Sequence, residues 1–252
     1  MAEFADIYAG QWILAAFVSK LEETGSAYES MSEISGITQL GIHPKNLKGD
    51  SLYIFSGYNN HEGYGFFVWD SIPGPGFGLT DDIFESRQGP QYALDYVLGT
   101  DTLLSIKEHY LDQDSSTTIA FQKILDSTGV TGIGVPGYDL VTRNVMLKGH
   151  YLVLDSAGSN RGIAHFDGPS GAITNFDFGH YTFSSDPIRG PSYSGDYIQF
   201  SKGENNYSTW RHLVFIAEND TIFLHQAEEV INSNDYLFEL GNVVYYLLPH
   251  KE

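Results

Sequence analysis

The 252-residue chain has no cysteine, few basic residues and no long apolar run. Without cysteine it can form neither disulfide bonds nor thiolate metal sites. Lysine and arginine together number 13, against 32 aspartates and glutamates, which gives a formal net charge of −19 at pH 7. Nucleic-acid binding requires basic side chains that neutralise phosphates, so this composition predicts no nucleic-acid partner.

The apolar run at residues 12–18, WILAAFV, is seven residues long, far short of the roughly 20 that a membrane-spanning helix needs. The sequence therefore predicts no membrane insertion. A loose helical period predicts an amphipathic N-terminal helix; the apolar residues that follow it are Phe4, Ile7, Leu14, Phe17 and Leu21. We expect that helix to dock on a neighbouring domain or on a second copy of the chain.

What the chain has in quantity is aromatic residues and glycine: 17 tyrosines, 16 phenylalanines and 27 glycines. Large aromatic side chains can build a core, and dispersed glycines suit many tight turns. After residue 128, short apolar segments separated by Gly, Asn, Asp, Ser and Pro predict a succession of strands. Residues 90–111 are mixed in pattern and predict a strand followed by a helix. The chain is therefore predicted to be mainly β.

Residues 57–71, GYNNHEGYGFFVWDS, can be interpreted in two ways. In a carbohydrate site, Trp69 would stack on a sugar while Glu62 or Asp70 acts on it. In a β-hairpin, the aromatic residues alternate along two strands and NNHEG supplies the turn. We favour the hairpin, because the alternation accounts for the aromatic residues without a ligand.

The strongest helical pattern covers residues 114–127, DSSTTIAFQKILDS. Asp114 or one of the serines after it can cap the first turn, and Gly129 follows the end, where helices often stop. Apolar pairs spaced four residues apart, such as Ala120 with Ile124, would share one face of this helix.

This segment and the residues after it resemble the N-terminal signature of the pectate-lyase-like right-handed β-helix superfamily. In that signature a short helix opens from an Asp-rich loop and caps a parallel β-helix, and a corner of the type Val-Pro-Gly-Tyr follows. The residues that carry the resemblance are Asp114, either Thr117 or Thr118, Ala120, Phe121, Gln122, Ile124, Leu125 and Asp126, with residues 135–138 at the corner.

The stretch around the predicted hairpin resembles a motif that phage tailspikes and tail fibres carry upstream of their β-helix. Its matching residues are Leu47, Gly49, Asp50, Gly57, Tyr58, Gly63, Gly65, Phe67, Trp69 and Asp70. Together the two motifs cover about residues 40–158.

The resemblance implies a short right-handed parallel β-helix, capped by a helix and preceded by a helical N-terminal segment and a small β domain. These parts would occupy residues 109–252, 1–40 and 41–108 respectively. The chain would be a structural or receptor-binding component of a phage tail, located in the virion and produced in the host cytoplasm. It would form a homotrimer, and its partners would be other virion tail proteins and, where it recognises the host, bacterial surface polysaccharide.

Two other functions also fit the sequence: a polysaccharide depolymerase, either a lyase or a glycoside hydrolase, and a secreted carbohydrate-binding β protein. A glycosidase needs two carboxylates about 5–10 Å apart. The candidate catalytic residues are Asp167, Asp177 and Asp196, although an aspartate at a strand end more often serves in a turn. The candidate carbohydrate-binding residues are Trp69, Tyr181 and Trp210. The histidines show no metal-binding spacing such as H-x-x-x-H, and no metal or other cofactor is predicted.

Overall fold

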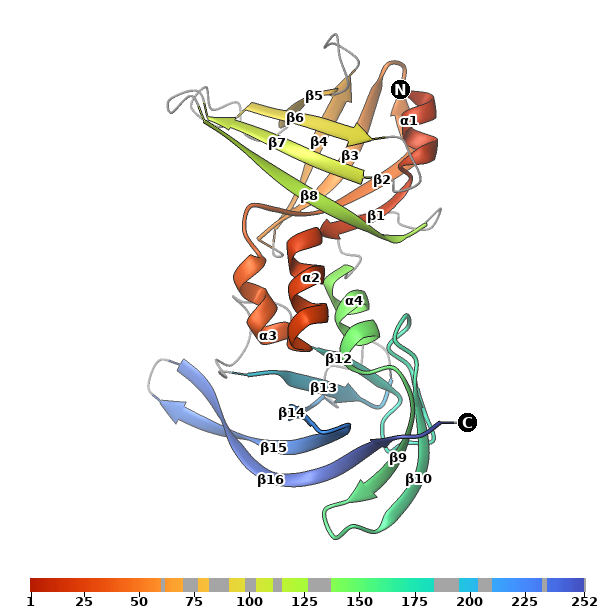
Figure 1. Ribbon diagram of the computed structural model, residues 1–252, viewed down its shortest axis with the longest axis vertical. Coiled ribbons are helices and arrows are strands. Elements are labelled where there is room, and N and C mark those ends of the chain that lie inside the picture. Colours follow the sequence, from red (N-terminus) through yellow and green to blue (C-terminus); the bar gives the residue numbers. More distant parts are fainter. Residues whose placement is uncertain are drawn as a thin grey trace. The chain divides into compact units, whose positions relative to one another are not determined.

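The computed structural model describes residues 1–59, 62–69, 77–81, 91–97, 103–110, 115–126, 137–183, 195–203, 210–232 and 235–251. These residues are mainly β, in two antiparallel sheets of eight strands each (Figure 1). The chain divides into two compact units. Unit 1 comprises Met1–Ser19 and Glu33–Gly137, and unit 2 comprises Lys20–Ser32 and Tyr138–Glu252.

Unit 1 is a closed barrel whose strands pair in the order of the sequence. Its first strand also pairs with its last, so that Gln11 lies opposite Leu125 and Leu14 opposite Phe121. This pairing removes the open edges that a flat sheet would leave. The strands are β1 (Gly10–Leu14), β2 (Ile37–Lys48), β3 (Ser51–Tyr58), β4 (Glu62–Trp69), β5 (Phe77–Asp81), β6 (Gln91–Val97), β7 (Leu103–Tyr110) and β8 (Ser115–Leu125).

Alternation along the strands separates the inner face of this barrel from its outer face. In β3, Ile54 and Ser56 are buried, whereas Phe55 between them is partly exposed. The register keeps the buried positions together, because Ile54 lies opposite Ile42 of β2 and Phe66 of β4. The apolar core of unit 1 therefore lies inside the barrel.

A short helix, α1 (Ala2–Ile7), precedes β1 and lies beside β2 (Figure 1). Trp12 of β1 is fully buried, and its Nε1 donates a hydrogen bond of 3.0 Å to the carbonyl oxygen of Tyr8. The Tyr8 and Trp12 rings stack with their centroids 5.8 Å apart. The Lys123 ammonium of β8 lies 5.6 Å from the centre of the Trp12 ring, a cation–π contact. Trp12 thus connects the α1 end of the chain with β1 and β8.

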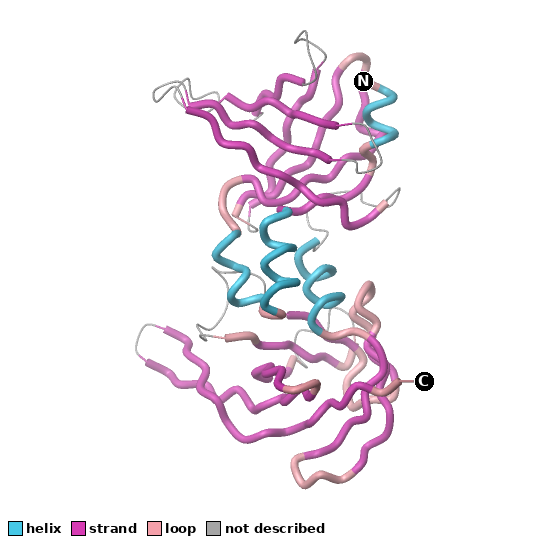
Figure 2. The backbone as a smooth tube through the Cα atoms, in the orientation of Figure 1, coloured by secondary structure: helices cyan, strands magenta, loops and turns pink. Residues whose placement is uncertain are grey.

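Unit 2 contains a sheet of strand order β11-β10-β9-β16-β15-β14-β13-β12. Figure 2 draws the strands of both sheets in magenta and the helices in cyan. The two edges of the unit 2 sheet meet at a single bridge between Ala172 and His180, beside a 2.8 Å hydrogen bond from the Tyr181 amide to the Gly171 carbonyl. The strands are β9 (Gly149–Asp155), β10 (Asn160–Phe166), β11 (Ile173–Thr174), β12 (His180–Phe183), β13 (Tyr197–Ser201), β14 (Arg211–Glu218), β15 (Thr221–Asn232) and β16 (Asp235–Pro249).

The other helices are short. They are α2 (Ala15–Thr24), α3 (Ala27–Ser30), the 3-10 helix η1 (Met31–Glu33) and α4 (Gly137–Met146). Among the described residues, every helix is too short or too polar to span a bilayer.

The two units share one order of antiparallel strand pairing. In each, a helix is followed by a glycine with positive φ, 138° at Gly10 and 109° at Gly149, and an aromatic residue stands two positions later, Trp12 or Tyr151. In each, the strand that begins at this glycine pairs with the next strand and with the last strand of its sheet. The chain therefore uses the same arrangement of consecutive antiparallel strands twice.

The predicted parallel β-helix is wrong, because every strand pairing in the described residues is antiparallel. Short apolar segments separated by turn residues are compatible both with hairpins and with the coils of a solenoid. The predicted boundary at residue 108 falls inside β7, and this strand pairs along its length with β8 in one barrel.

The predicted capping helix is wrong too, since Ser115–Leu125 forms β8. Its N-terminal half carries Thr117, Thr118 and Ile119, whose β-branched side chains favour strands. As a strand, the segment pairs with β7 and β1 and closes the barrel. These long-range pairings outweigh a local helical pattern.

The predicted element type also differs from the observed one at two other points. The predicted N-terminal helical segment contains a strand, β1, before α2 begins. At the predicted Val-Pro-Gly-Tyr corner, Gly137 and Tyr138 begin helix α4, while residues 135 and 136 lie outside the described residues.

Candidate functional site

The most unusual feature inside the unit 1 barrel is a buried acidic side chain on β7. Leu104, Ile106 and Glu108 are buried, whereas Lys107 is exposed, so Glu108 belongs to the inner face of the strand. Glu108 is only 8% exposed. Acidic residues are rarely buried to this extent unless a partner compensates their charge.

The Glu108 carboxylate has one hydrogen-bond partner in the described part of the chain, the Tyr110 hydroxyl, which donates to Oε2 at 2.8 Å. This hydrogen bond, with burial and the nearby negative charge, raises the pKa of Tyr110 above its ordinary value. The phenol therefore stays protonated and remains a donor to the carboxylate. No lysine, arginine or histidine among the described residues forms an ion pair with Glu108.

The other carboxylate oxygen of Glu108 extends across one end of the barrel. Oε1 lies 4.0 Å from the position that a Cβ on Gly36 would occupy, just before β2 begins. Strands β8 and β1 lie between β7 and β2 in the barrel. Gly36 itself is held by Asn59, whose Oδ1 accepts from the Gly36 amide at 2.8 Å. The carboxylate is thus directed into the barrel end that Gly36 and the end of β3 surround.

Two hydroxyl groups, one on β2 and one on β3, also lie on buried strand faces of unit 1. Thr38 is fully buried and donates to the Gly57 carbonyl at 3.2 Å. Ser56 is 4% exposed, and its Oγ has no hydrogen-bond partner in the described structure. A buried hydroxyl without a partner costs about 1–3 kcal/mol. We refer to Thr38, Ser56, Glu108 and Tyr110 as the inner polar group.

The inner polar group lies on the same faces of the strands as the apolar core. The low polarity of such surroundings strengthens any electrostatic contact made with the carboxylate. The group offers acceptor oxygens on Glu108, Ser56 and Tyr110, which suits a ligand that donates hydrogen bonds. The buried apolar side chains of these faces include Leu40, Ile54, Phe66, Leu94, Ile106 and Phe121.

Asp167, a predicted catalytic residue, lies in a turn of unit 2. Its carboxylate accepts a hydrogen bond from the Ser170 hydroxyl. Its amide donates to the Ala172 carbonyl at 2.9 Å, and its carbonyl accepts from the Gly171 amide at 2.8 Å. These contacts are those of a turn-stabilising aspartate.

Asp177, the second predicted catalytic residue, is exposed and accepts a 2.9 Å hydrogen bond from the Tyr245 hydroxyl. Burial is the main cause that raises the pKa of Tyr245, and the hydrogen bond to Asp177 adds to it. Phe176 packs against the Tyr245 ring with centroids 5.1 Å apart. Asp177 therefore fastens its loop to β16.

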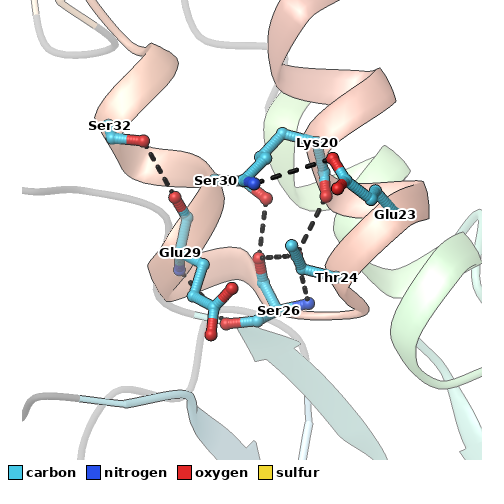
Figure 3. Close-up of polar contacts among 7 residues, drawn as sticks. All are labelled: Lys20, Glu23, Thr24, Ser26, Glu29, Ser30 and Ser32. Carbon is cyan, nitrogen blue, oxygen red and sulfur yellow. Dashed lines mark hydrogen bonds and ion pairs between the residues drawn. The ribbon is translucent and has the colours of Figure 1, made fainter.

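Asp196, the third predicted catalytic residue, holds the start of helix α3. Its Oδ1 accepts from the Tyr28 amide at 2.8 Å. Figure 3 shows the polar contacts within this helical segment, where the Ser26 Oγ accepts from the Glu29 amide at 3.1 Å and the Ser30 hydroxyl donates to the Ser26 carbonyl at 2.7 Å. Ser26 and Asp196 together satisfy amides of the first turn, which have no partner inside the helix.

We expect the stability conferred by Asp196 to depend on pH, because burial raises its folded-state pKa above the ordinary value of an aspartate, despite the hydrogen bonds from Tyr28, Ser26 and Ala27. Ionisation therefore costs stability as the pH rises from the ordinary aspartate pKa through the raised pKa of the folded state. Asp196→Asn should gain stability relative to the wild type over this interval, in urea unfolding measured at a series of pH values. Asp196→Ala should lose about 1–2 kcal/mol at every pH, since it removes the acceptor. A wild-type advantage over Asn that grows with pH would contradict this prediction.

The predicted carbohydrate-binding residues lie in different settings. Tyr181 is a core residue, 2% exposed, and its hydroxyl donates to the Leu147 carbonyl. Burial raises the pKa of Tyr181. Trp210, next to β14, is exposed at 36%. The backbone of Trp69 lies at the end of β4, and its side chain is outside the described part of the structure.

No family model matches the chain, and no match to it was found among curated proteins or solved structures. The described residues contain no group of three histidine, aspartate or glutamate side chains arranged to hold a metal ion. The site is therefore interpreted from its own geometry. Glu108 was not among the predicted site residues, although Leu104, Ile106, Glu108 and Tyr110 follow the period of two that is typical of one strand face.

Proposed function

We propose that unit 1 binds one small, mainly apolar ligand inside its barrel, with the inner polar group contacting the polar part of that ligand. Barrels of eight strands have interiors that side chains fill or that hold a single small ligand. The observation that carries the proposal is the buried Glu108 carboxylate with Tyr110 as its one hydrogen-bond partner among the described residues.

The stability of the fold does not explain why an acidic side chain occupies the buried position of Glu108. A buried charge without a counter-charge is destabilising, and an apolar side chain of similar volume is often at least as stable in its place. The unpartnered Ser56 hydroxyl adds a second cost in the same interior. Polar groups that cost stability are characteristic of sites where a ligand supplies the missing partner.

The test is a titration of the full chain with Nile red, a neutral apolar dye whose fluorescence rises on leaving water. We expect saturable binding of one dye per chain. Ser56→Leu, which places a leucine on the inner face of β3, should weaken binding about tenfold. Ser105→Leu is the matched control, because Ser105 lies on the outer face of β7 between Leu104 and Ile106.

A second measurement covers the case in which Ser56→Leu does not fold. In the wild type, the dye should shift the methyl NMR signals of Ile54 and Ile106 and leave that of Ile163 in unit 2 unchanged. Equal dye binding by both leucine variants, or shifts confined to unit 2, would contradict the proposal.

The predictions of a phage tail component, a homotrimer, a virion location and a polysaccharide ligand stay predictions. The capping-helix resemblance that supported them falls on a segment that forms β8. A molar mass of three chains in solution, measured by light scattering, together with binding to a bacterial surface polysaccharide, would support them. A depolymerase would release reducing ends from such a polysaccharide.

A further inference from the structure

We infer that the ligand of unit 1 carries a cationic nitrogen, an ammonium group attached to an apolar body. This inference rests on the proposed function, because it concerns the ligand of the same barrel. Its basis is the contact of Glu108 with a hydroxyl group and with no basic side chain in the described structure.

Charge balance favours a cation over a neutral ligand. The described lysines of unit 1 lie elsewhere: Lys107 is exposed on the outer face of β7, and Lys123 pairs with Asp126 at 2.7 Å. Lys45 and Lys48 lie at the far end of β2 from Gly36. A cationic ligand would bring the missing counter-charge into surroundings of low polarity, where an ion pair is strongest.

The geometry of the acceptors also fits an ammonium group. Tyr110 already donates to Oε2, so Oε1, which lies near Gly36 at one end of the barrel, is the oxygen left to accept from a ligand. A primary ammonium group has three N–H donors and no acceptor. Glu108 Oε1 and the Tyr110 hydroxyl beside it can both accept from such a group, whereas a ligand carboxylate would meet the negative charge of Glu108.

The experiment compares three ligands that share one alkyl chain: dodecylamine, dodecanol and dodecanoate. Each ligand is titrated against the complex of Nile red with the full chain, at neutral pH and below the concentration at which micelles form, and the displacement of the dye is measured. We expect dodecylamine to bind at least about tenfold more tightly than dodecanol, and dodecanoate to bind most weakly. Glu108→Gln should abolish the preference for the amine over the alcohol.

A matched variant controls for the overall charge of −19, which attracts any cation to the surface. Asp50→Asn removes one exposed acid from the turn after β2 and changes the net charge as much as Glu108→Gln does. It should keep the full preference for the amine.

The outcomes separate the ligand class from the proposed function. If Nile red and the alcohol bind but the amine has no advantage, or if Glu108→Gln keeps that advantage, the cationic ligand is refuted and the binding function stands. If neither Nile red nor any of the three ligands binds, both are refuted. An equal loss of preference in Asp50→Asn would refute the role of Glu108.

Discussion

Replacing Trp12 by alanine should lower the free energy of unfolding by about 3–5 kcal/mol, as removal of a fully buried tryptophan usually does. Trp12 has no exposed surface, and its indole N–H is bonded to the Tyr8 carbonyl at 3.0 Å. Truncation would leave a large cavity, break the stack with Tyr8 and expose the base of α1. The contact with Lys123 on β8 would be lost too, which weakens the junction between the first and last strands.

Urea unfolding followed by far-UV circular dichroism measures this effect. Trp210→Ala is the control, because Trp210 is 36% exposed and its truncation should cost less than about 1 kcal/mol. If both alanine variants unfold at the same urea concentration, the buried contacts of Trp12 with Tyr8 and Lys123 do not stabilise the barrel as the structure indicates.

The β3–β4 hairpin shows what could be predicted from the sequence. Residues 52–57 and 64–71 alternate in polarity, and the structure confirms two strands there, Ser51–Tyr58 and Glu62–Trp69, in continuous antiparallel register. The prediction succeeded because alternation is a local property of one strand face. The strands after α4, from the segment at Gly149 to that at Pro249, were predictable for the same reason.

The pairing of the strands could not be predicted in this way. Which strand pairs with which is decided by contacts far apart in the sequence, such as β1 with β8. The segment at Ser115–Leu125 shows the consequence, since its apolar pairs spaced four residues apart fit a helix locally, yet it is a strand between β7 and β1. A resemblance based on such local patterns therefore led to the wrong fold.

The candidate site was harder to predict than the fold. Aspartates beside aromatic residues were conspicuous in the sequence, but Asp167 and Asp196 stabilise a turn and a helix start. Glu108 was inconspicuous because residues 90–111 were interpreted partly as helix, whereas they contain β6 and β7. Only a closed barrel makes one face of β7 an interior, and that closure depends on long-range pairing.

Replacing Gly10 by alanine should be among the most destabilising single changes in unit 1. Gly10 has φ of 138°, which disfavours any residue with a Cβ atom. An added Cβ would also lie 2.2 Å from the carbonyl oxygen of Leu125 and 2.7 Å from Lys123 Cε. Since Leu125 belongs to β8, relief of this clash requires the first and last strands of the barrel to separate.

Gly149→Ala is the matched control, because Gly149 starts the equivalent strand of unit 2 with φ of 109° and has no atom within 4 Å of an added Cβ. Both variants incur backbone strain of about 1–3 kcal/mol, so the difference between them isolates the clash with β8. We expect Gly10→Ala to unfold at a clearly lower urea concentration than Gly149→Ala. Equal midpoints would mean that β1 and β8 do not approach as closely at Gly10 as the closed barrel requires, and the inner face that holds Glu108 would then lack its enclosure.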